Sequence, residues 1–238
     1  GLVGHAACTA LARRGHEVIA QYHTREPALP EGATPLRMDL SEPDALTPKL
    51  LELFPDVIVN AAAASNPAEV DEHPARAEKL NVQLPKRLAE VANHLSARLY
   101  HLSTDMVFDG REGGYRSTDM PAPANLYGQL KLLAEREVLK AGGTFATVLR
   151  ITIVTGDSPS GARSVHERLF DAWAAGKRPW LFTDEVRQPV AAENVGDLLA
   201  ELAERPNLHG IFHWAGQETL SRHAIGVRIA RHFNLPEA

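Results

Sequence analysis

A tyrosine and a lysine four residues apart are the side chains of this sequence best suited to acid–base chemistry. Tyr127 and Lys131 fall in the stretch 126–140, whose apolar spacing predicts a helix capped by Asn125. Positions i and i+4 project from one face of a helix. A phenol titrates near pH ~10, and a nearby ammonium favours its charged form. The spacing therefore predicts a lowered pKa for Tyr127 and a role as general acid or base.

A short polar run lies upstream, at the predicted end of a buried strand. The apolar run 99–102 predicts this strand. The residues that follow it are Ser103, Thr104, Asp105 and Met106. Side chains just past the C-terminal end of a parallel strand face the crevice in which open α/β sheets bind ligands. The Thr104 hydroxyl could hydrogen-bond the same substrate oxygen as the tyrosine. The tyrosine–lysine spacing alone also fits a solvated helix face, but this strand end favours a catalytic site.

The motifs STDMVFDG and NLYGQLKLLAE resemble those of the extended short-chain dehydrogenases/reductases, and most closely the dTDP-4-dehydrorhamnose reductase branch of sugar-nucleotide enzymes. The similarity covers nearly the whole chain. It implies that Thr104, Tyr127 and Lys131 form a catalytic triad and that Lys131 also holds the cofactor. The implied reaction is reduction of a keto group on a nucleotide-linked sugar. The implied cofactor is NADP(H), with NAD(H) left open.

Composition limits the other classes of function. At 238 residues the chain can bury a substantial core, as one large α/β domain or one domain with a small appendage. A net charge of -5 and no long basic run argue against nucleic acid as the main partner. No apolar run reaches the ~20 residues that a membrane span needs, and no signal peptide is visible. The single Cys8 suits a reducing compartment, so we expect a cytoplasmic location.

Strand and helix patterns alternate from residue 17 to residue 150, which predicts an α/β fold with a Rossmann-type, doubly wound parallel sheet. We expect an NAD(P)-binding domain over 1–150 and a mainly substrate-binding region over 151–238, interleaved with the sheet. The predicted elements include one long helical stretch over 67–94 and a short strand over 180–183. The chain has no initiator Met and begins inside a glycine motif, so the first strand of the domain is expected to be missing from it.

The first residues predict a glycine turn that leads into a helix over 5–14. Gly1 and Gly4 resemble the last two glycines of the family's Gly-x-x-Gly-x-x-Gly turn. There the backbone approaches a pyrophosphate and the helix N-terminus supplies N–H donors. An ordinary N-terminal cap is the alternative. After the next predicted strand no acid precedes Glu26, and Arg25 favours the 2′-phosphate of NADP(H), unless it merely lies in a solvated loop.

Three further segments are implicated in cofactor binding by the resemblance. Asp39, followed by Leu40, would reach the adenine edge, although Asp39 could equally cap the next helix. Asn81 is a poor helix former within a helical stretch and would support the proton network of the site. Small side chains after the apolar strand 56–60 would let a flat cofactor lie against the backbone, unless they serve tight packing. They are Ala61, Ala62 and Ala63.

Substrate contacts are expected at the strand end and in a later loop. On the resemblance, Ser103, Asp105 and Met106 lie beside the substrate. Arg187, in the segment DEVRQPV, is a candidate for a substrate phosphate because a guanidinium fork fits that geometry. A surface ion pair is the equal alternative. The family usually has aromatic residues where this chain has Met106 and Ile153, so the identity of the sugar nucleotide stays open.

A second class of function also stays open. The regulatory subunit of methionine adenosyltransferase resembles the same branch, and such a subunit would bind NADP without turnover. The expected partners are a nucleotide-sugar substrate and, as an open alternative, a second copy in a homodimer. Neither nucleic acid nor membrane is expected as a partner.

The eleven histidines do not predict a metal site. They are scattered, and no group of histidine, cysteine and aspartate shows the spacing of zinc ligands, so no metal is expected. His101 lies within a predicted strand. We expect it to be a core residue whose hydrogen bonds are satisfied.

Overall fold

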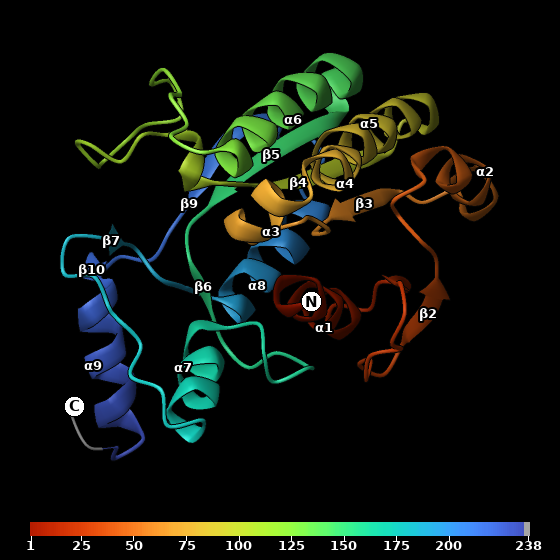
Figure 1. The fold of residues 1–238 in the computed structure, drawn as a ribbon. Helices are drawn as coiled ribbons and strands as arrows, with labels where there is room; N and C mark the ends of the chain where they lie inside the picture. Colours follow the sequence, from red (N-terminus) through yellow and green to blue (C-terminus); the bar gives the residue numbers. More distant parts are fainter. Residues whose placement is uncertain (236–238) are drawn as a thin grey trace.

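The protein is described by a computed structural model over residues 1–235. Its central sheet has four parallel strands in the order β3-β4-β5-β9 (Figure 1). These strands are β3 (Val57–Asn60), β4 (Arg98–Thr104), β5 (Ala146–Ile151) and β9 (Gly210–Trp214). A separate parallel pair consists of β1 (Val18–Tyr22) and β2 (Ala33–Arg37). The predicted α/β fold with a mainly parallel sheet is confirmed.

Helices cover both faces of the central sheet, which explains why β4 is buried along its whole length. Leu99 packs among the helices on one face and Tyr100 among those on the other, because successive side chains of a strand alternate. The helices on the Leu99 side are α2 (Pro43–Leu53), α5 (Leu84–Leu95) and α6 (Leu126–Gly142). Those on the Tyr100 side are α1 (Leu2–Arg13) and α8 (Ala192–Ala203). This two-sided cover is the doubly wound arrangement.

The long helical stretch predicted over 67–94 is broken into shorter pieces. The pieces are α3 (Pro67–Glu72), α4 (Pro74–Glu78), a π-helical turn (Lys79–Gln83) and α5. Pro74 has no N–H to donate and clashes with the preceding turn, so the chain restarts a helix there with the proline at its first position. The π-helical turn is a local widening of the kind often found at functional sites.

The strand predicted over 180–183 is also wrong, since these residues form no strand. Trp180 is 94% exposed and Phe182 60% exposed, so their side chains find neither a sheet partner nor a core. Instead, four short strands form two pairs, and the first of these strands precedes this loop in the sequence while the other three follow it. The pairs are β6 (Val154–Thr155) with β8 (Val190–Ala191), and β7 (Val186–Arg187) with β10 (Leu220–Ser221).

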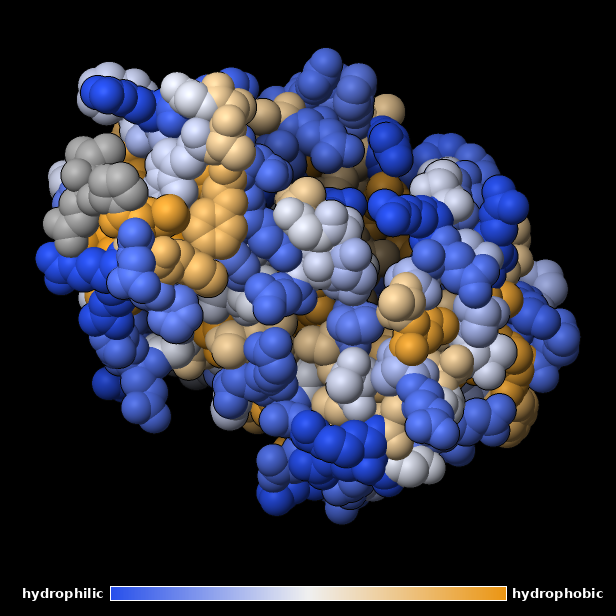
Figure 2. Space-filling view, turned by 90° about the horizontal axis from the view of Figure 1, so that it is seen from below, coloured by the Kyte–Doolittle hydropathy of each residue, from blue (hydrophilic) through white to orange (hydrophobic). Residues whose placement is uncertain are grey.

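Two helices form the far end of the molecule, α7 (Val165–Ala174) and α9 (Arg222–His232). They pack through a small core that includes Leu169 and Ile225. Figure 2 shows apolar surface at this end, on the left of the view, and a second apolar area on the right, with largely hydrophilic surface between them. Strand β9, which lies between these two helices in the sequence, pairs with β5 in the central sheet. A division of the chain at residue 150 stays a prediction.

No helix within residues 1–235 is long and apolar enough to cross a membrane.

Candidate functional site

The polar end of β4 lies against the beginning of α6. Thr104 is the last residue of β4, and its side chain lies close enough to the hydroxyl of Tyr127, in the first turn of α6, to lower the pKa of that hydroxyl. Asn125 caps α6 by accepting the N–H of Gly128 at 2.8 Å, which fixes where the helix begins. A Cβ atom added at Gly128 would lie 2.2 Å from the carbonyl oxygen of Met106. Glycine therefore lets the helix approach the strand end closely enough for the two hydroxyls to meet.

The pKa of Tyr127 is raised to about 12, first because its hydroxyl is buried and then because the carboxylate of Asp105 acts on it. The side chain of Thr104 opposes this shift and lowers the pKa. The lowering predicted from the neighbouring Lys131 is therefore wrong. Burial and a negative neighbour outweigh a lysine whose amino group is bonded elsewhere.

Lys131 lies one turn beyond the tyrosine and is 2% exposed. Its Nζ donates to the carbonyl oxygen of Leu102 at 2.6 Å and lies 3.2 Å from Nε2 of His101. Burial lowers the pKa of Lys131 to about 8, and the charge of Glu135 partly opposes that shift. Both hydrogen-bond partners belong to β4, so the amino group is directed at the strand rather than at the tyrosine hydroxyl.

A buried ion pair that the sequence analysis missed lies beside this lysine. Glu135 of α6 and Arg150 of β5 have side chains only 2% and 3% exposed, and Nη2 of the arginine lies 2.6 Å from Oε2 of the glutamate. Ser103 donates its hydroxyl to Oε1 of Glu135 at 2.5 Å. Ser103 is thus buried and bonded to Glu135, and its contact with substrate stays a prediction. The sequence signal that could have found Glu135 was its spacing. Tyr127, Lys131 and Glu135 follow one another at four-residue steps and therefore lie on one face of the helix.

Asp105 and Arg187 join the C-terminal region to the end of β4. Nη1 of Arg187 donates to Oδ2 of Asp105 at 2.8 Å, and its Nε donates to Glu185 at 3.2 Å. The ion-pair alternative for Arg187 is therefore the arrangement that the structure contains. Its contact with a substrate phosphate stays a prediction. Asp105 also accepts a hydrogen bond from Thr104 at 3.2 Å, so the pair sits directly beside the tyrosine site.

Neutralising Asp105 is expected to lower the pKa of Tyr127. Asp105→Asn removes the negative charge that raises this pKa and leaves Arg187 without its partner. An ultraviolet titration of tyrosinate, with the Tyr127→Phe spectrum subtracted, measures the shift. Glu185→Gln is the matched control, because it removes a carboxylate bonded to the same arginine that does not act on the tyrosine. An unchanged midpoint in Asp105→Asn would show that the carboxylate does not control the phenol.

Met106 lies beside the tyrosine in a small apolar cluster. It is partly buried against a group formed by Val70 of α3, Ala77 of α4 and Tyr127. A helical turn of 3-10 type at Asp105–Val107 places it there, with the Thr104 hydroxyl accepting the N–H of Met106 at 3.2 Å. Its contact with the substrate stays a prediction.

The N-terminus of α1 fits a phosphate group. The helix begins at Leu2, so Gly4 lies in its first turn, although the helix was predicted to begin only at residue 5. Gly1 is the N-cap, with no side-chain cap and no acid in the first turn. A Cβ atom at Gly1 would meet nothing within 4 Å, and one at Gly4 would meet only Cβ of Ala61, at 3.7 Å. Packing within the protein does not demand either glycine, whereas close approach of an anion to the helix N–H groups would.

The turn after β3 is held by two asparagines. Asn60 accepts the N–H of Ala62 at 3.2 Å. Asn81, fully buried in the π-helical turn, accepts the N–H of Ala64 and donates to its carbonyl oxygen, both at 2.9 Å. The structure therefore gives Asn81 the task of fixing the turn, while a part in the proton network stays a prediction. The small residues held in this turn are Ala61, Ala62 and Ala63.

The remaining predicted cofactor residues lie near β1 and β2. Arg25 is exposed in the loop after β1. Asp39 accepts the N–H of Ser41 at 2.8 Å, which lowers the pKa of Asp39. The N-cap of α2 is Glu42, so Asp39 stabilises a turn rather than capping that helix, and this alternative is wrong. Leu40 is partly buried against the core. Contacts of Arg25, Asp39 and Leu40 with a cofactor stay predictions.

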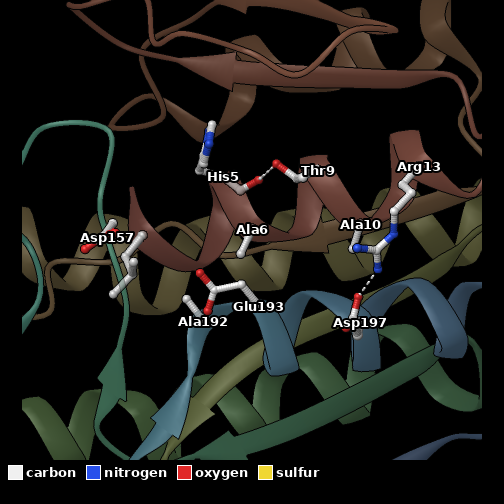
Figure 3. A pocket seen from close by; sticks show the side chains of 10 residues that line it. His5, Ala6, Thr9, Ala10, Arg13, Asp157, Ala192, Glu193 and Asp197 are labelled. Carbon is white, nitrogen blue, oxygen red and sulfur yellow. Dashed lines mark hydrogen bonds and ion pairs between the residues drawn. The ribbon is translucent and has the colours of Figure 1, made fainter.

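A cavity of about 220 Å³ opens between α1 and α8 (Figure 3). Arg13 of α1 reaches across it to Asp197 of α8, with Nη2 2.5 Å from the carboxylate oxygen. Its lining contains none of the predicted catalytic residues. The polar side chains that line it are His5, Thr9, Arg13, Asp157, Glu193 and Asp197.

Within residues 1–235, one group of possible metal ligands lies at the start of α7 and in the loop before it. The ligand atoms of Asp157, His166 and Glu167 lie within 4.8 Å of one another. The carboxylate of Glu167 already holds the preceding loop against the helix, because it accepts hydrogen bonds from three backbone N–H groups, those of Ser158, Arg163 and Ser164. The group therefore has a structural task, and the expectation of no metal stays a prediction.

Comparison with known proteins identifies the family. The model of the RmlD substrate binding domain matches residues 1–238. Methionine adenosyltransferase 2 subunit beta of Bos taurus is 34% identical over 207 residues, which make up 85% of this chain and 62% of the bovine protein. The probable low-salt glycan biosynthesis reductase Agl14 of Haloferax volcanii is 32% identical over 236 residues, or 96% of this chain and 76% of that protein.

Solved structures agree with this result. The hypothetical dTDP-4-dehydrorhamnose reductase from Sulfolobus tokodaii superposes with a TM-score of 0.85 and 29% identity, covering 100% of this chain and 81% of that one. The dTDP-4-dehydrorhamnose reductase of Bacillus anthracis, solved with NADP, has a TM-score of 0.78 at 20% identity over 87% of this chain and 73% of that one, a likeness of fold. The chain belongs to the RmlD substrate binding domain family, the dTDP-4-dehydrorhamnose reductase branch of the extended short-chain dehydrogenases/reductases.

Proposed function

We propose that the protein reduces a keto group on a nucleotide-linked sugar, with NADPH as the reductant. The observation that carries this proposal is the contact between Thr104 and Tyr127 at the end of β4, with Lys131 one turn further along the same helix. Membership of the family and the likeness to the reductase Agl14 support it. When bound, NADPH supplies the hydride that a carbonyl carbon accepts.

The protein's own side chains supply the proton and its placement. A pKa of about 12 keeps the Tyr127 hydroxyl protonated at neutral pH, so the tyrosine is suited to give its proton to the carbonyl oxygen. Thr104 orients that hydroxyl and donates to the same oxygen. Negative charge develops on this oxygen during reduction, and donors fixed there therefore stabilise the transition state more than the ground state.

Three parts of the fold would hold the cofactor. The first turn of α1, with Gly1 and Gly4, offers N–H groups to the pyrophosphate. The turn at 61–63 presents small side chains beside that helix, since Ala61 is the neighbour nearest to Gly4. Lys131 would hold the nicotinamide ribose, and Arg25 the 2′-phosphate that distinguishes NADPH from NADH.

Arg25→Asp is expected to shift cofactor preference from NADPH towards NADH. The change replaces a phosphate partner with a repelling carboxylate. A charge-assisted hydrogen bond contributes about 1.5–3 kcal/mol, so NADPH affinity should fall ~10- to 100-fold. Titration of cofactor binding by fluorescence measures both affinities. Arg178→Asp, at an exposed arginine in the loop after α7, is the matched control. Equal or tighter NADPH binding in Arg25→Asp would contradict the assignment.

The likeness to methionine adenosyltransferase 2 subunit beta favours a second candidate, an NADP-binding regulatory subunit without turnover. The same assay separates the two. NADPH oxidation is followed against a panel of 4-keto nucleotide sugars, and binding to a methionine adenosyltransferase catalytic chain is measured in parallel. Oxidation that depends on one of the sugars supports the reductase. Cofactor binding without oxidation, together with a stable complex, supports the regulatory subunit.

A further inference from the structure

Three buried side chains from three different elements form one hydrogen-bonded chain beneath the tyrosine site. Nδ2 of Asn60 lies 3.0 Å from Nδ1 of His101, and Nε2 of His101 lies 3.2 Å from Nζ of Lys131. The chain has a fixed backbone contact at each end. The N–H of Ala62 donates to Oδ1 of Asn60 at 3.2 Å, and Lys131 donates to the oxygen of Leu102 at 2.6 Å. Nothing in the proposed reaction has yet used His101.

The proton positions in this hydrogen-bonded chain can be assigned by starting from the N–H of Ala62. A backbone N–H can only donate, so the atom of Asn60 that meets Ala62 is the oxygen, and the NH₂ group faces His101. Nδ1 of His101 must then accept. Burial, the largest cause, holds the pKa of His101 well below its usual value, so the ring is neutral and carries its single proton on Nε2. That proton points at Lys131. Every hydrogen bond is satisfied only if Lys131 is a neutral amine with a free lone pair.

Protonation of Lys131 forces a rearrangement. An ammonium group has no lone pair and can only donate, so Nε2 of His101 must become the acceptor. One proton from solvent is added in total, and the imidazole keeps one proton, now on Nδ1. This Nδ1–H needs an acceptor, and the oxygen of Asn60 is the atom within reach once the carboxamide turns over. The N–H of Ala62 then loses its partner.

We propose that His101 is a positioning residue that couples the protonation of Lys131 to the Ala62 turn by exchanging its tautomer. The coupling is a property of the protein alone. Only the role of this coupling as a link between Lys131 and a cofactor that lies on the turn rests on the proposed function. Because coupling between two sites is reciprocal, an acceptor bound to the freed N–H of Ala62 would favour the ammonium form of Lys131.

The charges around Lys131 leave it as the group that titrates. The titratable groups that act on it are His101 of β4 and Glu135 of α6. One step further away, Glu135 is held in the buried ion pair with Arg150 of β5. Asp105 acts on Tyr127 of α6. The tyrosine titrates far higher, at about 12. The switch is therefore expected at the pKa of Lys131, about 8.

Nuclear magnetic resonance of ¹⁵N-histidine-labelled protein tests the tautomer directly, since the shifts of the two ring nitrogens show which one carries the proton. Loss of a signal in His101→Gln assigns the ring. As pH rises through the pKa of Lys131, the proton of His101 is expected to move from Nδ1 to Nε2, and no exchange is expected in Lys131→Met. A single tautomer across the transition, or an exchange that persists in Lys131→Met, would overturn the proposal.

The backbone amide of Ala62 gives an independent readout. In the natural protein its ¹H–¹⁵N signal should shift with the same midpoint as the His101 ring. His101→Gln places a carboxamide near the position of Nε2, so it can accept from the ammonium without turning Asn60 over, and the Ala62 signal should then stop responding. The remaining amide signals report whether the variant is folded. An Ala62 signal that ignores pH in the natural protein would contradict the coupling.

These outcomes are separable from those of the proposed function. A tautomer exchange without reduction of any sugar would leave the coupling standing and remove the reductase. Reduction of a sugar by a protein whose His101 keeps one tautomer would support the reductase and remove the coupling.

Discussion

Replacing Tyr127 by phenylalanine is expected to lower turnover ~10²- to 10⁴-fold while leaving NADPH binding nearly unchanged, because that is the usual contribution of a positioned general acid. The ring still fills its place in the apolar cluster with Val70 and Ala77, so the variant should fold. Only the hydroxyl that contacts Thr104 is lost. Steady-state kinetics on the true substrate and cofactor titration by fluorescence measure the two quantities.

Tyr100→Phe is the matched control for this experiment. Tyr100 is also a buried tyrosine, in the same strand that leads to the site, but its hydroxyl donates to the carbonyl oxygen of Leu202 on the opposite face of the sheet. Its loss should affect stability and not the chemical step. Full turnover in Tyr127→Phe would contradict the assignment of Tyr127 as the general acid.

Glu135→Ala is expected to destabilise the fold by ~3–5 kcal/mol, because removing one partner of a buried ion pair leaves the other charge uncompensated. Arg150 is 3% exposed and would keep its charge inside the protein. Ser103 would also lose the acceptor of its hydroxyl. Equilibrium unfolding in denaturant, followed by circular dichroism, gives the free energy of unfolding.

An exposed pair provides the comparison. Glu201→Ala breaks an ion pair with Arg205 whose side chains are 49% and 63% exposed, and such pairs contribute at most ~1 kcal/mol. The double variant Glu135→Leu with Arg150→Met should recover most of the stability, since it removes both buried charges together. A loss in Glu135→Ala no larger than that in Glu201→Ala would show that the buried pair is not what holds α6 against β5.

The parts of the fold that are buried on both faces were predictable from sequence. Residues 57–59 of β3 and most of residues 99–102 of β4 are apolar because helices cover both faces of the sheet, and this pattern is visible in the sequence. The four-residue step from Tyr127 to Lys131 likewise specifies a shared helix face. The break at Pro74 was also readable, because proline ends or restarts a helix. The prediction of one continuous helix over 67–94 did not take the missing N–H of Pro74 into account.

What could not be predicted depends on which side chains meet across elements. Glu135 and Arg150 are both charged, and charged residues are rarely buried unless they are paired, so the sequence predicts neither as a core residue. His101 was predicted to be a satisfied core residue, and it is. Its partners come from β3 and α6, and no local pattern names them. The raised pKa of Tyr127 likewise reflects burial, which spacing along a helix does not measure.

A label-transfer measurement tests the central claim most directly. NADPH that carries deuterium at the reactive carbon of the nicotinamide is incubated with the protein and a 4-keto nucleotide sugar, and the sugar is analysed by mass spectrometry. The account predicts an alcohol product with one deuterium on the former keto carbon, formed more slowly in Tyr127→Phe by the same factor as turnover. A protein that binds NADPH but returns the sugars of the panel unlabelled and unreduced would contradict it.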